Sequence, residues 1–180
     1  NYLFKKRGKK ANYKVIDMIV DMAGDSVGHL ENEIEKISIQ IEDRENILIT
    51  DLEKYSGWKK DRKLWEFLKV FSEKNYDQSI LLGKSIISAN ETMVTLIYPL
   101  TSMFTELLLA KYENGTFSGS SGYVPLPPSI KKKIPQFSRK FNEAELESSL
   151  EYLGYIDQRQ KTKFSNDETD LIQFILHVIG

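Results

Sequence analysis

An apolar stripe with alternating spacings of three and four residues restricts the fold of this chain more than any other feature. Its members are Val27, Leu30, Ile34, Ile37 and Ile41. In an α-helix, residues at these spacings lie on one face. The stripe therefore predicts an amphipathic helix over 27–41, and Ser26 can cap its start.

The same helical periodicity recurs along the chain, and no segment shows a convincing alternation of polar and apolar residues. Further helices are predicted at about 15–22, 50–56, 64–71, 77–88, 91–113, from 129, 143–161 and from 166 onwards. Thr50 and Glu53 have the spacing of a capping box, and Pro99 should bend or split its helix because proline lacks an N–H. The segment 114–129 is rich in glycine, serine and proline and is predicted to be a loop.

The predicted fold class is therefore all-α, with two domains. Residues 1–57 should form a small three-helix domain that ends near Gly57. Residues 58–180 should form a helical bundle.

Composition excludes several classes of protein. The 180 residues are 41% hydrophobic and 28% charged, which is enough apolar material for real cores. The absence of cysteine excludes disulfides and thiolate metal sites and favours a cytoplasmic protein. No apolar run approaches the length of a membrane span, and no signal peptide is visible, so no membrane partner is expected.

The net charge of −1 identifies no partner, but the basic residues are clustered. Residues 1–14 and 114–142 contain no acid. Their basic residues are Lys5, Lys6, Arg7, Lys9, Lys10 and Lys14 in the first segment, and Lys131, Lys132, Lys133, Arg139 and Lys140 in the second. Such runs form a solvated face or, less often, a phosphate-binding one.

The segment HLENEIEKI, 29–37, could be a metal site, an acid–base pair or a solvated helix face. Glu31, Glu33 and Glu35 lie off the apolar stripe, and Glu33 can pair with Lys36. A dicarboxylate metal site would need a second helix with a Glu-x-x-His pattern, which is missing. We therefore expect this acidic face to be structural or to contact a partner, with His29 on the surface.

No catalytic residue, cofactor or metal ligand is predicted. Gly83, Lys84 and Ser85 resemble the end of a phosphate-binding loop, but Gln78 stands where that loop needs glycine, and the segment is predicted to be mid-helix. The histidines His29 and His177 lie in unrelated helices, and no Gly-x-Ser-x-Gly elbow occurs.

The segment DQRQKTKF, 157–164, is a candidate nucleic-acid contact. Asp157 and Lys161 can pair along the helix, and Lys163 and Phe164 follow at its end. Phe164 could stack on an unpaired base while Lys161 and Lys163 meet phosphates. On the residues alone the simpler interpretation is favoured, namely that Phe164 fills the junction between two helices.

The order of these segments resembles the bacterial DNA polymerase III delta subunit. DMAGDSVGHLENEIEKISI (21–39) and ILITDLEKYSG (47–57) are similar to its lid module. LWEFLKVFSEKNYDQSILLGKSII (64–87) resembles the start of its helical collar domain, and LEYLGYIDQRQKTKF (150–164) is similar to its C-terminal signature. The resemblance spans almost the whole chain, but it leaves the loop 114–129 unexplained.

The resemblance implies a non-catalytic subunit of the clamp loader, which places the sliding clamp on primed DNA for the DNA polymerase holoenzyme. Its lid would be 1–57 and its collar, which assembles the pentamer, 58–180. The implied partners are the tau/gamma and delta-prime subunits and, weakly, primer–template DNA, with Lys161, Lys163 and Phe164 beneath the collar. The family binds the sliding clamp through an N-terminal domain, which we expect to precede this segment.

The alternative is a helical DNA-binding regulator with a helix-turn-helix-like unit at 1–57. It would need a recognition helix with exposed Arg, Asn or Gln side chains. The 27–41 helix should instead expose Glu31, Glu33 and Glu35, which would repel phosphate.

Overall fold

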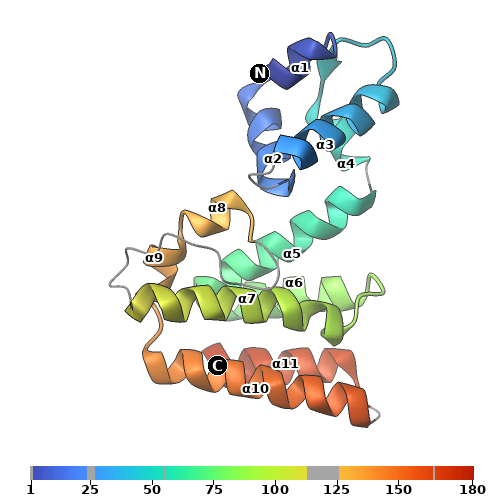
Figure 1. Cartoon of the computed structure of the whole chain (residues 1–180). Helices are drawn as coiled ribbons and strands as arrows, with labels where there is room; N and C mark the ends of the chain where they lie inside the picture. The colour runs from blue at the N-terminus through green and yellow to red at the C-terminus, as the bar shows by residue number, and fades with distance from the viewer. Residues whose placement is uncertain (1, 24–26, 55, 113–125, 164) are drawn as a thin grey trace. The chain divides into compact units, whose positions relative to one another are not determined.

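The fold was analysed in a computed structural model that describes residues 2–23, 27–54, 56–112, 126–163 and 165–180. The chain is mostly helical, which confirms the predicted fold class (Figure 1). It divides into two compact units. The first comprises Asn1–Arg62 with Pro127–Ser129, and the second comprises Lys63–Leu126 with Ile130–Gly180. The assignment of 1–57 as a lid and 58–180 as a collar stays a prediction.

The first unit contains short helices and one minimal β-ladder. Its elements are α1 (Tyr2–Lys6), β1 (Lys10–Ala11), α2 (Tyr13–Ala23), α3 (Val27–Gln40), β2 (Asn46–Ile47) and α4 (Ile49–Glu53). Strands β1 and β2 are parallel, with Lys10 opposite Asn46 and Ala11 opposite Ile47. Helix α1 and the ladder were not predicted, because segments of two to five residues are too short to show a period.

The predicted apolar stripe forms the inner face of α3. Ile34 and Ile37 are buried, as is Ile41 directly after the helix. They pack with Phe4 of α1 and with residues of α2, β2 and α4. Val27 departs from the prediction, because 65% of its surface is exposed. The expected cap, Ser26, lies outside the described residues.

The predicted capping box at Thr50 is wrong. Helix α4 begins at Ile49, and its N-cap is Leu48, whose backbone N–H donates to the Asp51 carboxylate over 2.8 Å. Asp51 is buried, and Arg44 donates to its other oxygen at 2.5 Å. Burial raises the pKa of Asp51, but the hydrogen bonds from Arg44 and Leu48 outweigh burial and hold it below its ordinary value.

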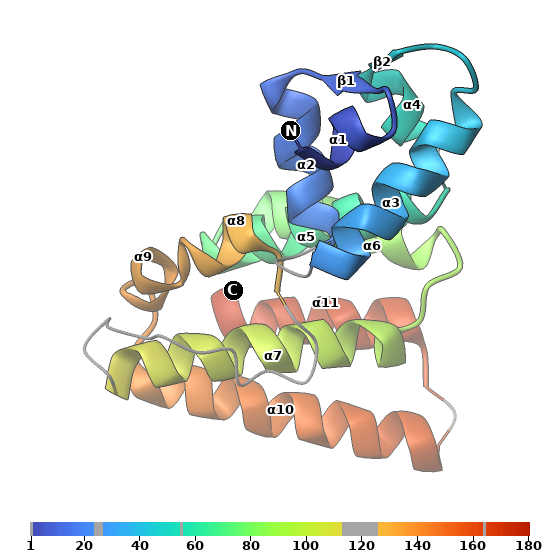
Figure 2. The ribbon, with the colours of Figure 1, turned by 45° about the horizontal axis from the view of Figure 1, so that its top comes forward.

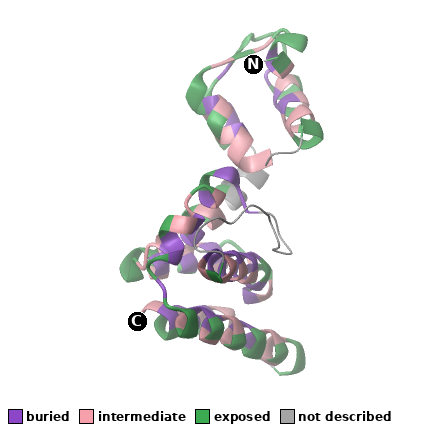
Figure 3. Cartoon of the chain, turned by 60° about the vertical axis from the view of Figure 1, so that its left-hand side comes forward, coloured by how far each residue is buried: buried purple, intermediate pink, exposed green. Residues whose placement is uncertain are grey.

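The remaining helices build the second unit, although α5 and α8 begin in the first. They are α5 (Ser56–Ser72), α6 (Tyr76–Ile87), α7 (Met93–Tyr112), α8 (Pro128–Lys131), α9 (Ile134–Ser138), α10 (Glu143–Thr162) and α11 (Asp167–Ile179). Helices α7, α10 and α11 lie side by side (Figure 1, Figure 2). Buried positions face neighbouring helices and exposed positions face away (Figure 3).

Phenylalanines from four segments of the second unit meet at its centre. The ring of Phe71 lies 5.6 Å from Phe67 and 5.6 Å from Phe174, measured between centroids. Phe104 makes edge-on contacts with Phe71 at 5.8 Å and with Phe141 at 6.0 Å. Such aromatic pairs stabilise a core beyond the burial of their area, so this cluster fixes how α5, α7 and α11 pack.

Helix α7 is continuous through Pro99, so the predicted split did not occur. Proline removes one hydrogen bond but is tolerated here because both neighbouring turns pack into the core. The 20-residue helix is apolar enough to cross a membrane by length and composition, with a mean hydropathy of 1.5, contrary to the sequence prediction. In the structure 61% of its apolar window is buried, as suits the core helix of a bundle.

Gly83 lies inside α6, as the sequence predicted, and not in a phosphate-binding loop. It lies where α6 packs against α11. A Cβ atom at this position would lie 2.8 Å from Cδ2 of Leu171 and 3.4 Å from Cε2 of Phe67. The glycine is therefore explained by helix packing.

Candidate nucleic-acid interface

The predicted contact residues lie at the C-terminal end of helix α10, whose start is well defined. The Asn142 side chain accepts a hydrogen bond from the Glu145 backbone N–H at 2.8 Å, and Glu145 accepts one from the Asn142 N–H at 2.7 Å. This reciprocal capping box fixes the first turn. Buried Leu153 and Ile156 then hold the helix in the core. The candidate residues follow at its far end.

Lys161 lies in the last turn of α10, exposed, and forms the predicted ion pair with Asp157 at 2.6 Å. The hydrogen bond and charge of Asp157 raise the pKa of Lys161, and the Tyr98 hydroxyl of α7 adds to this effect. Lys161 therefore keeps its positive charge at the end of the helix. The sequence did not reveal Tyr98, because it occurs within the apolar run of α7.

Lys163 is the C-cap of α10, exposed and extended, and its backbone N–H donates to the Arg159 carbonyl at 2.9 Å. Its side chain is therefore open to solvent at the end of the helix. Phe164, the proposed stacking residue, lies outside the described residues. The structure thus brings Lys161 and Lys163 to one helix end and leaves the role of Phe164 a prediction.

A cluster of polar contacts between Arg159, Gln160 and Asp170 joins this end of α10 to α11. Arg159 forms an ion pair with the Asp170 carboxylate, and the Gln160 amide donates to the other oxygen of Asp170 at 2.7 Å. Asp170 is buried, so its charge is compensated by these two donors. The Arg159 guanidinium also lies 5.3 Å from the ring centre of Tyr155. These contacts fix the helix end from which Lys161 and Lys163 extend.

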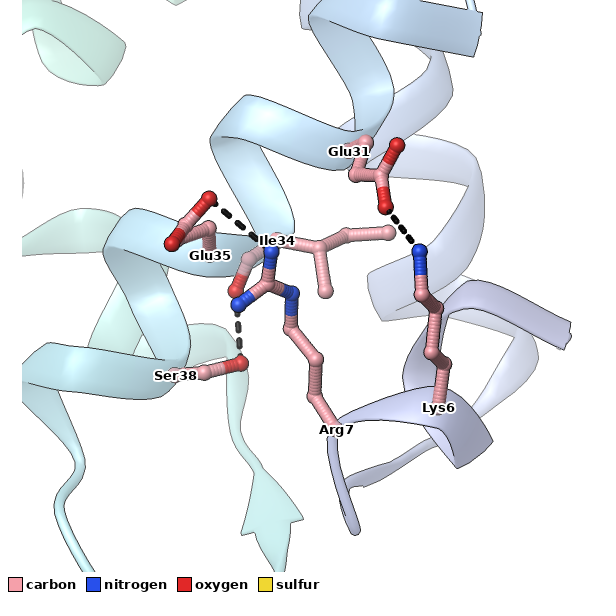
Figure 4. Close-up of polar contacts among 6 residues, drawn as sticks. All are labelled: Lys6, Arg7, Glu31, Ile34, Glu35 and Ser38. Atoms are coloured by element: carbon pink, nitrogen blue, oxygen red, sulfur yellow. Dashed lines mark hydrogen bonds and ion pairs between the residues drawn. The ribbon is translucent and has the colours of Figure 1, made fainter.

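The acidic face of α3 turns out to be paired within the first unit. Lys6 donates to Glu31 at 2.7 Å, and Arg7 donates to Glu35 at 2.9 Å, one helical turn further along (Figure 4). The hydrogen bond and charge of Lys6 lower the pKa of Glu31.

Other charged residues of the first unit are also paired within that unit. Glu33 pairs with Lys36 at 2.7 Å, as predicted, and Lys10 pairs with Glu45 at 2.7 Å. The basic residues at 6–10 are therefore largely neutralised by acids of the same unit.

Helix α3 exposes Asn32 and Gln40 but no arginine. It also carries Glu31, Glu33 and Glu35, whose carboxylates would repel phosphate. This acidic character counts against the helix-turn-helix alternative.

His177 does not belong to a catalytic set among the described residues. Its Nε2 atom lies 2.9 Å from Ser148 Oγ, and its ring stacks on Tyr152 with centroids 4.4 Å apart. His177 and Ser148 line a shallow cavity of about 300 Å³. The nearby Glu145 carboxylate is engaged by Lys74 at 2.8 Å and by a backbone N–H, so it does not orient the imidazole. In the described part of the chain, no three histidine or carboxylate side chains are placed to share a metal ion.

Comparison with known proteins gives three results. No protein family model matches the chain. The sequence is 24% identical over 159 residues to the DNA polymerase III subunit delta of Bacillus subtilis, covering 84% of this chain and 46% of that protein. The fold superimposes on the solved structure of the Bacillus subtilis DNA clamp loader delta protein with a TM-score of 0.80 and 20% identity, covering 99% of this chain and 53% of that one.

The chain thus spans about half the length of the proteins it matches. The sequence match and the shared fold agree on one relative. The predicted resemblance is confirmed: the chain is homologous to the DNA polymerase III delta subunit, over the C-terminal half of that protein.

Proposed function

We propose that the chain is the lid and collar portion of a clamp-loader delta subunit, a cytoplasmic assembly protein without catalytic activity of its own. The homology over the C-terminal half of the delta protein carries this proposal. The second unit supports it physically, because a helical bundle with closely packed aromatic rings at its centre is rigid enough to hold neighbouring subunits together. Its partners would be the tau/gamma and delta-prime subunits.

Within that assembly, the end of α10 would contact primer–template DNA weakly. Lys161 and Lys163 are exposed there and would bind phosphates, and Phe164 would stack on a base. The Arg159 and Gln160 contacts to Asp170 support this assignment, because a phosphate contact gains from a fixed backbone. Contact with the sliding clamp would come through another domain of the full protein.

The experiment is a reconstitution with the full-length protein and its cognate tau/gamma and delta-prime subunits. Gel filtration should show one stable complex, and the full-length protein alone should not hydrolyse ATP. A truncated protein that ends before residue 63 should lose complex formation because it lacks the second unit. If the truncated protein still assembles, the second unit is not the assembly domain.

The DNA contact is tested separately in the assembled complex. Phe164→Ala should weaken binding to primed DNA roughly fivefold to a hundredfold, the usual effect of losing one stacked base. Phe164→Trp is the matched control and should retain binding, because it keeps an aromatic face. Equal affinity of the alanine variant and the wild type would remove Phe164 from the interface.

A further inference from the structure

We propose that the basic segment 131–140, on the surface of α8 and α9, is a second phosphate-binding surface for DNA, distinct from the end of α10 (orange in Figure 2). The proposal rests on the proposed clamp-loader function. The five cations of this segment are Lys131, Lys132, Lys133, Arg139 and Lys140.

The backbone of this segment is held firmly from below. Ile130, Ile134 and Phe137 are buried in the core of the second unit, at spacings of four and three residues. The Ser138 hydroxyl, also buried, donates to the Leu107 carbonyl of α7 at 2.9 Å. Because one face is anchored, the other residues of the segment are directed outwards. Lys132, Arg139 and Lys140 are exposed.

The charges of this surface are not neutralised by the protein. None of the five cations forms an ion pair with an acid among the described residues. Lys140 donates to the Glu73 backbone carbonyl at 3.2 Å, a contact that leaves its charge in place. The basic residues of the first unit behave differently, since Lys6 and Arg7 pair with carboxylates. The segment 131–140 therefore has charge available for an external anion.

The composition of the surface favours nucleic acid over a protein partner. Protein interfaces are anchored by apolar and aromatic side chains at their centre. No large hydrophobic residue among the described residues between Tyr112 and Tyr155 is exposed, and those at 126–141 are buried. Binding by cations alone is typical of contacts with a phosphate backbone.

The placement of the cations along the chain is also suitable. Lys131 ends α8, Lys132 and Lys133 lie in the turn before α9, and Arg139 and Lys140 follow α9. One DNA strand presents a phosphate about every 3.4 Å along the helix axis, so neighbouring cations can meet successive phosphates. Such contacts read no sequence, which suits a machine that acts at any primed site.

The test uses the assembled loader with the full-length subunit, and compares three forms by fluorescence anisotropy on primed DNA between about 50 and 200 mM salt. The test variant combines Lys131→Gln, Lys132→Gln and Arg139→Gln. The control combines Lys5→Gln, Lys14→Gln and Lys54→Gln, three exposed positions in the first unit that remove the same charge.

We expect the test variant to lower the log–log salt slope by about two to three and to weaken binding at least tenfold, because each phosphate contact contributes about 0.9 to the slope. The control should change the slope by less than about one. Wild-type slope and affinity in a fully assembled test variant would overturn the inference and leave the proposed function intact.

Assembly is measured in parallel by gel filtration. If the test variant fails to join the complex while the control joins, the surface contacts an acidic protein neighbour, and the DNA proposal is wrong. If even the wild-type protein does not assemble, the proposed function itself fails. Far-UV circular dichroism should give the same helix content for all three forms, because every substituted side chain lies outside the buried core.

Discussion

The glycine in α6 allows the packing of the second unit to be tested by one pair of substitutions. Gly83 faces α11, whereas a Cβ atom at Gly154, in the middle of α10, would meet no neighbouring side chain within 4 Å. Alanine is favoured over glycine in a helix interior by about 1 kcal/mol. Gly154→Ala should therefore stabilise the protein by about 0.5 to 1 kcal/mol.

At Gly83 the same gain is opposed by crowding. The new methyl group would lie 2.8 Å from Cδ2 of Leu171 and 3.5 Å from Cδ1 of Ile175. The Leu171 side chain must move by roughly 0.6 to 0.8 Å, and overpacking of this kind typically costs about 1 to 3 kcal/mol. We expect Gly83→Ala to be at least about 1 kcal/mol less stable than Gly154→Ala. Gly83→Val, which adds two more carbons, should lose about 2 to 4 kcal/mol.

Urea denaturation followed by far-UV circular dichroism measures these free energies of unfolding. With a slope of about 1 to 3 kcal/mol per molar urea, a difference of about 1 kcal/mol shifts the midpoint by roughly 0.3 to 1 M. If Gly83→Ala stabilises the protein as much as Gly154→Ala, the close approach of α6 to α11 is wrong. Binding of a nucleotide that is lost in Gly83→Ala would revive the hypothesis of a phosphate-binding loop in this segment.

Two further predictions concern the first unit. Because the pKa of Asp51 is lowered in the folded state, its contribution is present above the pKa of the unfolded chain, near 4, and is lost as the pH falls through the folded value. Acid titration of the stability of Asp51→Asn should therefore be flatter below about pH 4 than that of the wild type, and an unchanged profile would rule out the Arg44 contact. Glu35→Lys should lower the urea midpoint of this unit, and adding Arg7→Glu should restore it by re-forming the pair in reverse; no restoration would mean that the two charges are not coupled.

Much of the second unit could be predicted from local sequence. The bounds of α10 and α11 agree with the predictions to within about a residue, because Asn142 and Asn166 are capping residues directly before strongly periodic segments. The ion pair of Lys161 with Asp157 was also predicted, since residues four apart on a helix are neighbours. Such features depend on residues within one or two turns.

The candidate site could be predicted only in part. The sequence indicated Lys161 and Lys163 but not the contacts of Arg159 and Gln160 with Asp170, because nothing local shows that α10 and α11 meet there. For the same reason the sequence could not show that Tyr98 of α7 influences the pKa of Lys161. The continuous path of α7 through its proline is likewise a result of packing on both sides.

By itself the sequence determined that the chain is helical and which helix faces are apolar, because these properties follow from the spacing of neighbouring residues. It also predicted the bounds of α2, α3, α6, α7 and α10 to within about two residues. Tertiary structure alone decided which charges are neutralised. The two basic runs look alike in the sequence, yet Lys6 and Arg7 of the first pair with carboxylates of α3, whereas the second run pairs with none among the described residues. The physical reason is that an ion pair requires two groups within about 4 Å, and for residues 25 or more positions apart only the packing of the helices sets that distance.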